Sequence, residues 1–390
     1  MSARKRRVLF VSAIRSEYDI LYAVMRAVDA HPALAAELIV TGAHLSPRFG
    51  STVEEIERDG FRIVARLESL VDADTRAARV RGAGLQLAGL ADLCERLRPD
   101  FLFAPMDREE AITVALAGSY LRIPVLHLGG GENSEDGIVD NAIRHATSRL
   151  AHVHFATTAA SGARLVRAGE EPWRVHVVGA PGLDRLRQVP PMPDGELARR
   201  LGFDALPPRF VVVIQHPFIS EIDAAADQMR ATLDAVVALG LPALVSHPNS
   251  DAGGRAMVDV IEAYAARYPA TLRARANLPR DVFVNAMRRA AALVGNSSCG
   301  LAEAPLYGLP AVNVGRRQRG REHAANVRFV PHDPGEIRTA LERAVFDGAY
   351  RAEVAACESP YGDGRAGERI AEIVAGLEID DRLMTKRMLA

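Results

Sequence analysis

The sequence predicts an α/β protein built from two Rossmann-like domains, and three observations lead to this class. Its 390 residues, 48% hydrophobic and 25% charged, have an ordinary globular composition but exceed what one core usually organises. Short apolar runs alternate with longer amphipathic segments, which is typical of parallel sheets covered by helices. A proline-rich stretch at residues 187–202 separates two such series and is typical of a linker.

The first series contains six strand-sized apolar runs, each bounded by polar, glycine or proline residues. They are residues 7–14, 36–45, 100–106, 124–130, 152–158 and 174–182. Between them lie helical patterns such as residues 17–30 and 109–122. This half therefore predicts a parallel sheet with helices on its faces.

The second series repeats the pattern after the linker. Its strand-sized runs are residues 209–217, 242–249, 270–279, 291–298 and 310–315. We therefore expect an N-terminal domain at 1–186, a C-terminal domain at 187–365, and a helix or tail at 366–390 that returns to the first domain. Ligands of such sheets bind at the carboxyl ends of the strands, so we expect a central cleft where these ends face each other.

Charge and cysteine content exclude several classes of protein. The formal net charge is −1, which argues against nucleic acid or an anionic membrane as the main partner. The three cysteines are odd in number and far apart, which suits a reducing cytoplasm. The apolar part of the N-terminus is strand-sized, too short for a secretory signal, and no apolar run approaches the roughly 20 residues of a membrane span. We expect a cytoplasmic protein.

Residues 294–305 (VGNSSCGLAEAP) are a candidate anion site in the second domain. A strand ends at Gly295, and a helix is expected to begin near Gly300. The side chain of Ser297 or Ser298 can cap the N-terminus of this helix. Free backbone N–H groups at a helix start favour an anion, and small residues let it approach. Glu303, one turn later, can accept hydrogen bonds from both hydroxyls of a ribose. Plain N-capping with a surface glutamate explains the segment equally well.

Arginines supply further candidate anion ligands. Arg15 follows the first strand, where a guanidinium can make a two-pronged contact with a diphosphate. A cluster of arginines follows the strand at 310–315; its members are Arg316, Arg317, Arg319 and Arg321. Both features also have a simpler interpretation, a surface charge for Arg15 and a solvated basic turn for the cluster.

Polar side chains also follow strands where they would reach the cleft. Asp107 comes directly after a buried strand of the first domain, and His216 does the same in the second. His247 and Asn249 follow the next strand. A single histidine in such a place is more often structural, but several strand-end polar residues together indicate a site.

Carboxylates crowd the segment after the strand at 124–130. They are Glu132, Glu135, Asp136 and Asp140. Clustered acids near basic phosphate ligands are what proton transfer on a nucleotide sugar requires, although Asp140 can also simply pair with Arg144, four residues later. The first strand lacks a Gly-x-Gly-x-x-Gly pattern and no His/Cys spacing fits zinc, so we expect neither a dinucleotide cofactor nor a metal.

Seven segments, in this order, resemble the UDP-N-acetylglucosamine 2-epimerase family. They are residues 12–21, 40–52, 106–110, 127–158, 177–184, 247–255 and 295–321. The resemblance runs from about residue 8 to about residue 330 and is closer to the hydrolysing branch, which supplies N-acetylmannosamine-type sugars for sialic and legionaminic acid biosynthesis. It implies a glycosyltransferase-B-like architecture, in agreement with the strand pattern.

The resemblance also implies a role for individual residues. On the nucleotide side it places Arg15 near the diphosphate, and Gln318 and Arg321 in a basic turn that closes on the nucleotide. The residues that hold the phosphates and ribose of UDP would be Ser297, Ser298, Gly300 and Glu303. It implies a nucleotide-sugar substrate, UDP as product, no cofactor, and a homo-oligomer, dimeric or tetrameric.

For the chemical step, the residues that match the family's motifs are Asp107, Glu132, Asp140 and His216. Met106 replaces the family's glycine before Asp107. The stretch from Glu132 to Asp140 is one residue longer than usual, so the matching acid can also be Glu135 or Asp136.

The chemistry that the resemblance implies begins with loss of UDP, because the C2 hydrogen of an N-acetylhexosamine is not activated by a ring carbonyl. Elimination would give a glycal, and addition of water with a proton delivered to the opposite face of C2 would give a free sugar inverted at C2. A non-hydrolysing epimerase, a glycosyltransferase on the same scaffold, and a non-catalytic nucleotide-sugar sensor are the alternatives; the sensor would not need Asp107, Glu132 and Asp140 together.

Overall fold

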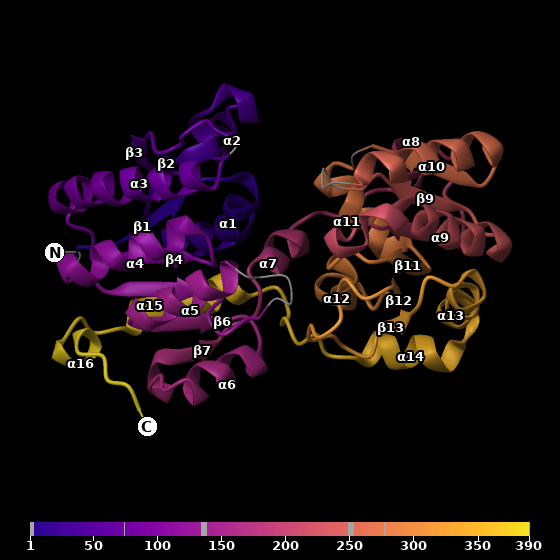
Figure 1. Cartoon of the computed structure of the whole chain (residues 1–390). Coiled ribbons are helices and arrows are strands. Elements are labelled where there is room, and N and C mark those ends of the chain that lie inside the picture. Colours follow the sequence, from indigo (N-terminus) through magenta and orange to yellow (C-terminus); the bar gives the residue numbers. More distant parts are fainter. Residues whose placement is uncertain (1–3, 74, 134–138, 249–252, 277, 390) are drawn as a thin grey trace. The chain divides into compact units, whose positions relative to one another are not determined.

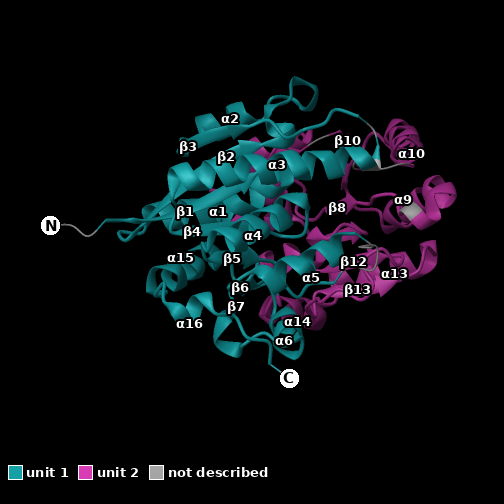
Figure 2. Ribbon diagram, turned by 60° about the vertical axis from the view of Figure 1, so that its left-hand side comes forward, with its two compact units in different colours: residues 1–185, 361–390 teal, residues 186–360 magenta. Residues whose placement is uncertain are grey.

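The computed structural model describes residues 4–73, 75–133, 139–248, 253–276 and 278–389. The chain divides into two compact units: unit 1 comprises residues 1–185 and 361–390, and unit 2 comprises residues 186–360 (Figure 2). Each unit is a parallel β-sheet with helices on both faces (Figure 1). The predicted α/β class with two Rossmann-like parts is therefore confirmed.

Unit 1 has seven parallel strands in the order β3-β2-β1-β4-β5-β6-β7. The strands are β1 (Arg6–Ser12), β2 (Leu34–Thr41), β3 (Ile63–Leu67), β4 (Phe101–Pro105), β5 (Val125–Leu128), β6 (Val153–Ala156) and β7 (Val175–Val177). The helices are α1 (Arg15–Ala30), α2 (Val53–Arg58), α3 (Arg76–Leu97), α4 (Glu109–Leu121), α5 (Asp140–Leu150), α6 (Ala159–Arg167), α15 (Ala366–Gly376) and α16 (Asp381–Met384), with short 3-10 helices at Gly42–Leu45, Pro47–Phe49 and Pro172–Arg174. The strand order reverses between β1 and β4, so the loops after these two strands diverge and leave room for a ligand.

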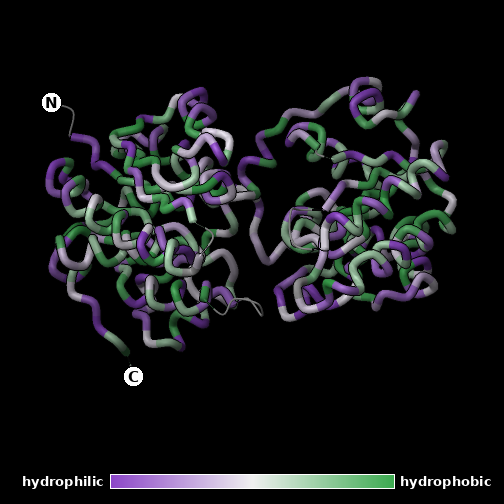
Figure 3. The backbone as a smooth tube through the Cα atoms, turned by 45° about the horizontal axis from the view of Figure 1, so that its top comes forward, coloured by the Kyte–Doolittle hydropathy of each residue, from purple (hydrophilic) through white to green (hydrophobic). Residues whose placement is uncertain are grey.

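The core of unit 1 has two layers because successive strand side chains point to opposite faces. In β1, Val8 and Phe10 pack into the layer formed with α1 and α15, whereas Leu9 and Val11 pack into the layer formed with α3 and α4. Figure 3 shows the hydrophobic stretches concentrated in the middle of each unit. A sheet buried on both faces explains why its inner strands read as continuous apolar runs.

The C-terminal segment folds back onto unit 1. Helix α15 packs against α1, where a Cβ on Gly367 would lie 2.7 Å from the carbonyl oxygen of Ala23. Lys386 donates to the Ser148 carbonyl at 2.6 Å and lies 2.7 Å from the buried Glu170 carboxylate. The chain's last residues thereby satisfy carbonyls at the end of α5 that have no partner inside the helix.

Unit 2 has six parallel strands in the order β10-β9-β8-β11-β12-β13. The strands are β8 (Val211–Ile214), β9 (Ala243–Ser246), β10 (Leu272–Arg275), β11 (Ala292–Gly295), β12 (Ala311–Val314) and β13 (Val327–Val330). The helices are α8 (Asp194–Leu201), α9 (Ala225–Leu239), α10 (Gly254–Arg267), α11 (Arg280–Arg289), α12 (Cys299–Ala302), α13 (Pro334–Phe346) and α14 (Gly348–Ala356), with 3-10 helices at Ile219–Ala224 and Ala304–Tyr307. Helix α7 (Gly182–Arg187) spans the boundary between the units.

Two strands were missed by the sequence analysis, β3 and β13. Both are edge strands, and most of their residues are only partly buried. Each carries an arginine, Arg66 and Arg328, where an inner strand carries an apolar residue. An edge strand needs less apolar surface, so its run is too polar to stand out.

None of the helices in the described part of the chain has both the length and the apolar character that a membrane span requires.

Candidate active site

The loop after β4 presents Asp107 through an unusual backbone turn. Met106 adopts φ 52°, a left-handed conformation that favours glycine. The backbone of Met106 bonds to Leu128, and a Cβ on Gly129, itself at φ 81°, would lie 2.6 Å from the Met106 sulfur. The methionine that replaces the family's glycine therefore fits because the residue beside it, directly after β5, is Gly129.

Arg144 on α5 connects the candidate acids of unit 1. Its buried guanidinium forms an ion pair with Asp107 and donates to the Glu132 carbonyl at 2.9 Å and to the Asn141 side chain at 3.0 Å. The Glu132 carboxylate accepts a hydrogen bond from the Thr157 hydroxyl. The structure thus brings Asp107 and Glu132 to one cation.

Asp140 is the first residue of α5 and is partly buried. The alternative that it pairs with Arg144 is not the arrangement found, because the described ion pair of Arg144 is with Asp107. The charge of Asp140 acts instead on Arg79. The hydrogen bond that Arg79 donates to Glu109 raises the pKa of Arg79 most, and the charge of Asp140 also raises it. Glu135 and Asp136, the other candidate acids, lie outside the described residues.

Arg15 stands apart from these acids as the first residue of α1. Its guanidinium is largely exposed, with its Nε 3.6 Å from a Glu55 carboxylate oxygen. Two residues later, Glu17 is buried and accepts a hydrogen bond from the Ala13 backbone at 2.8 Å. Burial, and then the charge of Glu110, raise the pKa of Glu17 well above its usual range. The sequence pattern does not reveal this buried carboxyl, because the pattern of its helix is that of an ordinary amphipathic helix.

In unit 2, Asn296 ties together three loops at the carboxyl edge of the sheet. Its side chain accepts from the His216 backbone N–H at 2.7 Å and donates to the His216 carbonyl at 2.8 Å. Its own carbonyl accepts from Arg317 at 3.1 Å and from Gln318 at 3.0 Å. The loops after β8, β11 and β12 therefore share one buried amide, which the sequence analysis did not single out although it lies between the strand-ending Gly295 and the two serines.

The segment after β11 forms a short helix, as predicted, and this helix begins at Cys299, directly before Gly300. Position 295, where φ is 132°, requires a glycine, because a Cβ there would lie 2.1 Å from the Ile214 carbonyl oxygen. The Ser297 hydroxyl, not that of Ser298, accepts from the Cys299 N–H at 3.4 Å, and Ser298 is exposed.

Glu303 lies at the carboxyl end of α12 and is partly buried. Desolvation raises its pKa to about 7, opposed by the positive charge of Arg280. A carboxyl group in this state changes charge near neutral pH, which an exposed glutamate does not. The structure therefore distinguishes Glu303 from the simple surface glutamate that the sequence also allowed.

The remaining candidates of unit 2 differ in their surroundings. Gln318 is buried, whereas Arg321 is exposed. The side chain of His247 bonds to Glu262 on α10 at 2.8 Å, which is a structural role of the kind that single histidines usually have. Arg316 is 2.5 Å from Glu221. Asn249 lies outside the described residues.

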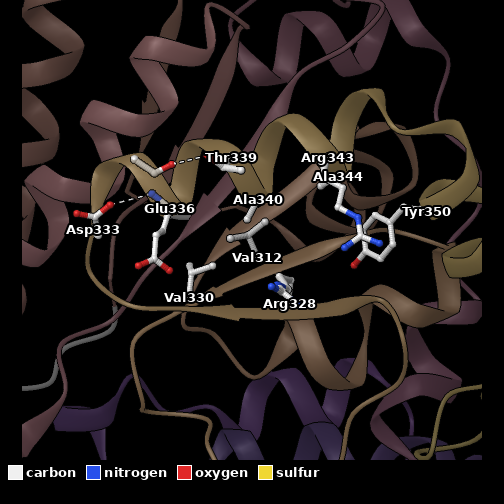
Figure 4. A pocket seen from close by; sticks show the side chains of 11 residues that line it. Val312, Arg328, Val330, Asp333, Glu336, Thr339, Ala340, Arg343, Ala344 and Tyr350 are labelled. Carbon is white, nitrogen blue, oxygen red and sulfur yellow. Dashed lines mark hydrogen bonds between the residues drawn. The ribbon is translucent and has the colours of Figure 1, made fainter.

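A cavity of about 470 Å³ in unit 2 lies away from these candidates, between α13 and strands β12 and β13 (Figure 4). Charged side chains of both signs, Arg328, Arg343 and Glu336, stand around apolar ones. In Figure 4 the Arg343 guanidinium lies beside the Tyr350 ring, 4.7 Å from its centroid. None of the predicted site residues lines this cavity.

No group of three or more His, Cys, Asp or Glu side chains that could hold a metal ion occurs among the described residues.

These features define a class, an enzyme of two Rossmann-like units. Acidic residues follow the strands of unit 1, and in unit 2 three loops that carry basic residues follow the strands and are joined by Asn296. The crystal structure of UDP-GlcNAc 2-epimerase from Neisseria meningitidis bound to UDP-GlcNAc has the same fold, with a TM-score of 0.74 and 18% identity over 94% of this chain and 99% of that one. This similarity confirms the glycosyltransferase-B-like fold.

The sequence profile of the UDP-N-acetylglucosamine 2-epimerase family matches residues 26–375. The UDP-N,N'-diacetylbacillosamine 2-epimerase (hydrolyzing) of Legionella pneumophila is 32% identical over 381 residues, which is 98% of both chains. The GDP/UDP-N,N'-diacetylbacillosamine 2-epimerase (hydrolyzing) of Campylobacter jejuni is 28% identical over 87% of both chains.

The chain belongs to the UDP-N-acetylglucosamine 2-epimerase family. The predicted family is confirmed, and with it the predicted class of enzyme, a hydrolysing nucleotide-sugar 2-epimerase.

Proposed function

We propose that this chain removes UDP from a UDP-linked 2-acetamido sugar and releases the free sugar with inverted configuration at C2. The observation that carries the proposal is the Arg144-centred cluster, in which one guanidinium holds both Asp107 and the loop of Glu132, with Asp140 at the start of the same helix. The names of the Legionella and Campylobacter relatives support a substrate with acetamido groups at C2 and C4. UDP-N-acetylglucosamine is the simpler candidate of the same class.

The reaction proceeds in two steps. In the first, a carboxylate takes the C2 proton while the C1–O bond breaks, and the bonding electrons leave with UDP; the product is a glycal. In the second, a carboxylic acid delivers a proton to the opposite face of C2, and water adds its hydroxyl at C1 and returns its proton to a carboxylate. The products are UDP and a free reducing sugar inverted at C2.

Unit 1 supplies the groups that transfer protons. Asp107, Glu132 and Asp140 serve as the base and the acid, and positioned proton transfer of this kind contributes about 10²–10⁴-fold in rate. Arg144 orients the Asp107 carboxylate through their ion pair. The Thr157 hydroxyl orients the Glu132 carboxylate by donating a hydrogen bond to it.

Unit 2 supplies the groups that hold the nucleotide. The Ser297–Gly300 backbone and the basic turn with Gln318 and Arg321 stabilise the charge that develops on UDP, together with Arg15 of unit 1. His216, whose backbone is held on both sides by Asn296, orients or protonates the leaving group. Homo-oligomerisation remains a prediction from the sequence.

The decisive experiment is turnover in deuterated water. We expect UDP to be released together with a free 2-acetamido sugar of the manno configuration that carries deuterium at C2. Release of UDP with C2 unlabelled and not inverted would contradict the proposal.

The same assay separates the alternatives. An inverted sugar still attached to UDP would identify a non-hydrolysing epimerase. Turnover that depends absolutely on an acceptor would identify a glycosyltransferase, and tight UDP binding without turnover a sensor.

Glu303 gives the nucleotide site a pH dependence. If its carboxylate accepts the ribose hydroxyls, the ionised form binds, and with a pKa near 7 the carboxyl becomes protonated as the pH falls below neutrality. We expect the affinity for uridine, which carries no phosphate, to weaken by about tenfold between pH 8 and pH 6, because the ionised fraction of this carboxyl falls from about nine tenths to about one tenth. Titration calorimetry measures this directly. Glu303→Gln should bind with little pH dependence; an unchanged slope in that variant would remove Glu303 from ribose binding.

A further inference from the structure

Unit 1 contains a cavity of about 400 Å³ at the carboxyl ends of β1, β2 and β3, closed by α3 and the start of α4. This volume is within the about 300–1,000 Å³ range of small-molecule sites. None of the predicted site residues lines it, but two lining residues are their neighbours in the chain: Ile14 precedes Arg15, and Arg108 follows Asp107. The cavity therefore borders the proposed site without having a role in it so far.

The walls of the cavity are mainly apolar. They include Ala43, Phe49, Leu70, Val71, Ala78 and Ala83. A sugar hydroxyl placed against such a wall would lose its hydrogen bonds to water without replacement, at a cost that a methyl group does not incur. The walls therefore select for methyl groups over hydroxyls.

Three buried polar side chains interrupt the apolar lining, the uncharged Gln86 and Ser69 and the charged Glu110. The Gln86 amide nitrogen donates to the Thr113 hydroxyl at 2.7 Å, which fixes the side chain and leaves its carbonyl oxygen as the group that can accept from a ligand N–H. The Ser69 hydroxyl is 2.7 Å from that of Thr41. An acetamido group combines an N–H, a carbonyl and a methyl, so it matches a lining of this composition.

The four charged side chains of the lining are paired with each other. Arg79 lies 2.6 Å from Glu109, and Arg108 lies 3.2 Å from Glu109 and 3.3 Å from Glu110. Two arginines are thus matched by two glutamates, so the lining offers no excess positive charge to a phosphate or carboxylate. The cavity suits a neutral group.

Arg108 places the cavity next to a proton-transfer group, because it lines the cavity and directly follows Asp107 in the chain. With C1 and C2 of the sugar at Asp107, the substituents at C4 and C5 lie on the other side of the ring. A sugar bound in this way can extend that side into the cavity.

We propose that this cavity is a specificity pocket that takes an acetamido group at C4 and a methyl group at C6 of the sugar, and that Phe49, Ala83 and Gln86 determine this choice. The inference rests on the proposed function. It predicts that the enzyme prefers a UDP-2,4-diacetamido-2,4,6-trideoxyhexose to UDP-N-acetylglucosamine.

The test compares UDP-N,N'-diacetylbacillosamine with UDP-N-acetylglucosamine in the full-length enzyme, measuring UDP release and C2 inversion. The wild type should prefer the first substrate in kcat/KM by about tenfold or more, the range that a filled apolar pocket gives. Ala83→Leu should fill the pocket and lower kcat/KM for that substrate by about 10–200-fold, with a change of less than about threefold for UDP-N-acetylglucosamine. The control is Ala77→Leu, the same change at an exposed position of α3 that does not line the cavity.

Phe49→Ala provides a second variant whose fold is not at risk, because the Phe49 side chain is half exposed. It should reduce the preference for the diacetamido sugar. Equal turnover of both substrates by the wild type, or equal losses on both in Ala83→Leu and Phe49→Ala, would overturn the pocket assignment. A wild type that releases UDP from neither substrate would instead overturn the proposed function.

Discussion

Asp107→Asn should reduce turnover by about 10²–10⁴-fold, the usual contribution of a positioned acid or base. The amide keeps the size of the side chain but can neither take the C2 proton nor balance the charge of Arg144. The measurement is UDP release and deuterium incorporation at C2 under single-turnover conditions, with UDP binding measured in parallel. Because Asp107 is proposed to act on the sugar rather than on the nucleotide, UDP affinity should change little.

A matched control is Asp92→Asn, the same substitution on an exposed residue of α3. It should leave turnover within about twofold, as surface substitutions away from special features usually do. If Asp107→Asn retains full activity, Asp107 has no part in proton transfer, and Glu132 and Asp140 remain as the candidates.

The second large effect concerns stability. Arg174 is fully buried in unit 1 and donates to four backbone carbonyls: those of His152, Leu383, Arg382 and Thr385. Its guanidinium also stacks on Trp173, 4.2 Å from the ring centroid. Arg174→Met should lower the free energy of unfolding by at least about 3 kcal/mol, since each buried carbonyl left without a donor costs about 1–3 kcal/mol.

Arg382 provides an unusually close control. It stacks on the same ring at 4.4 Å but is exposed, so Arg382→Met loses the stacking alone, a contribution of about 0.5–1 kcal/mol. Trp173 is the chain's single tryptophan and lies in unit 1, so its fluorescence in a urea titration follows this unit. Equal shifts in the two variants would show that stacking, and not the carbonyl contacts, holds the C-terminal segment.

Much of the fold followed from local patterns. The inner strands, such as β4 and β11, are buried on both faces, so their apolar runs stand out and end where the loop begins. The edge strands β3 and β13 were missed for the converse reason. Asp107 was found because it directly follows such a run, and Ser297 because a serine two residues after the strand-ending Gly295 can cap a helix.

The partners of these residues could not be found in the same way. The spacing of four residues allowed Arg144 to pair with Asp140 on its own helix. In the structure it pairs with Asp107, 37 residues earlier. Asn296 and Arg174 gave no signal, since a single asparagine or arginine has no period or spacing to mark it.

The amino-acid sequence by itself determined the class, the family and the positions at which chemistry is placed, because burial imposes a readable pattern on every inner strand and because motif order is a property of the chain. Only the tertiary structure decided which groups face each other: Asp107 and the Glu132 loop at Arg144, the loops around Asn296, and the apolar cavity next to Arg108. Hydrogen bonds and ion pairs join residues that are distant in the chain, and their energies depend on distance and burial, which no local pattern encodes.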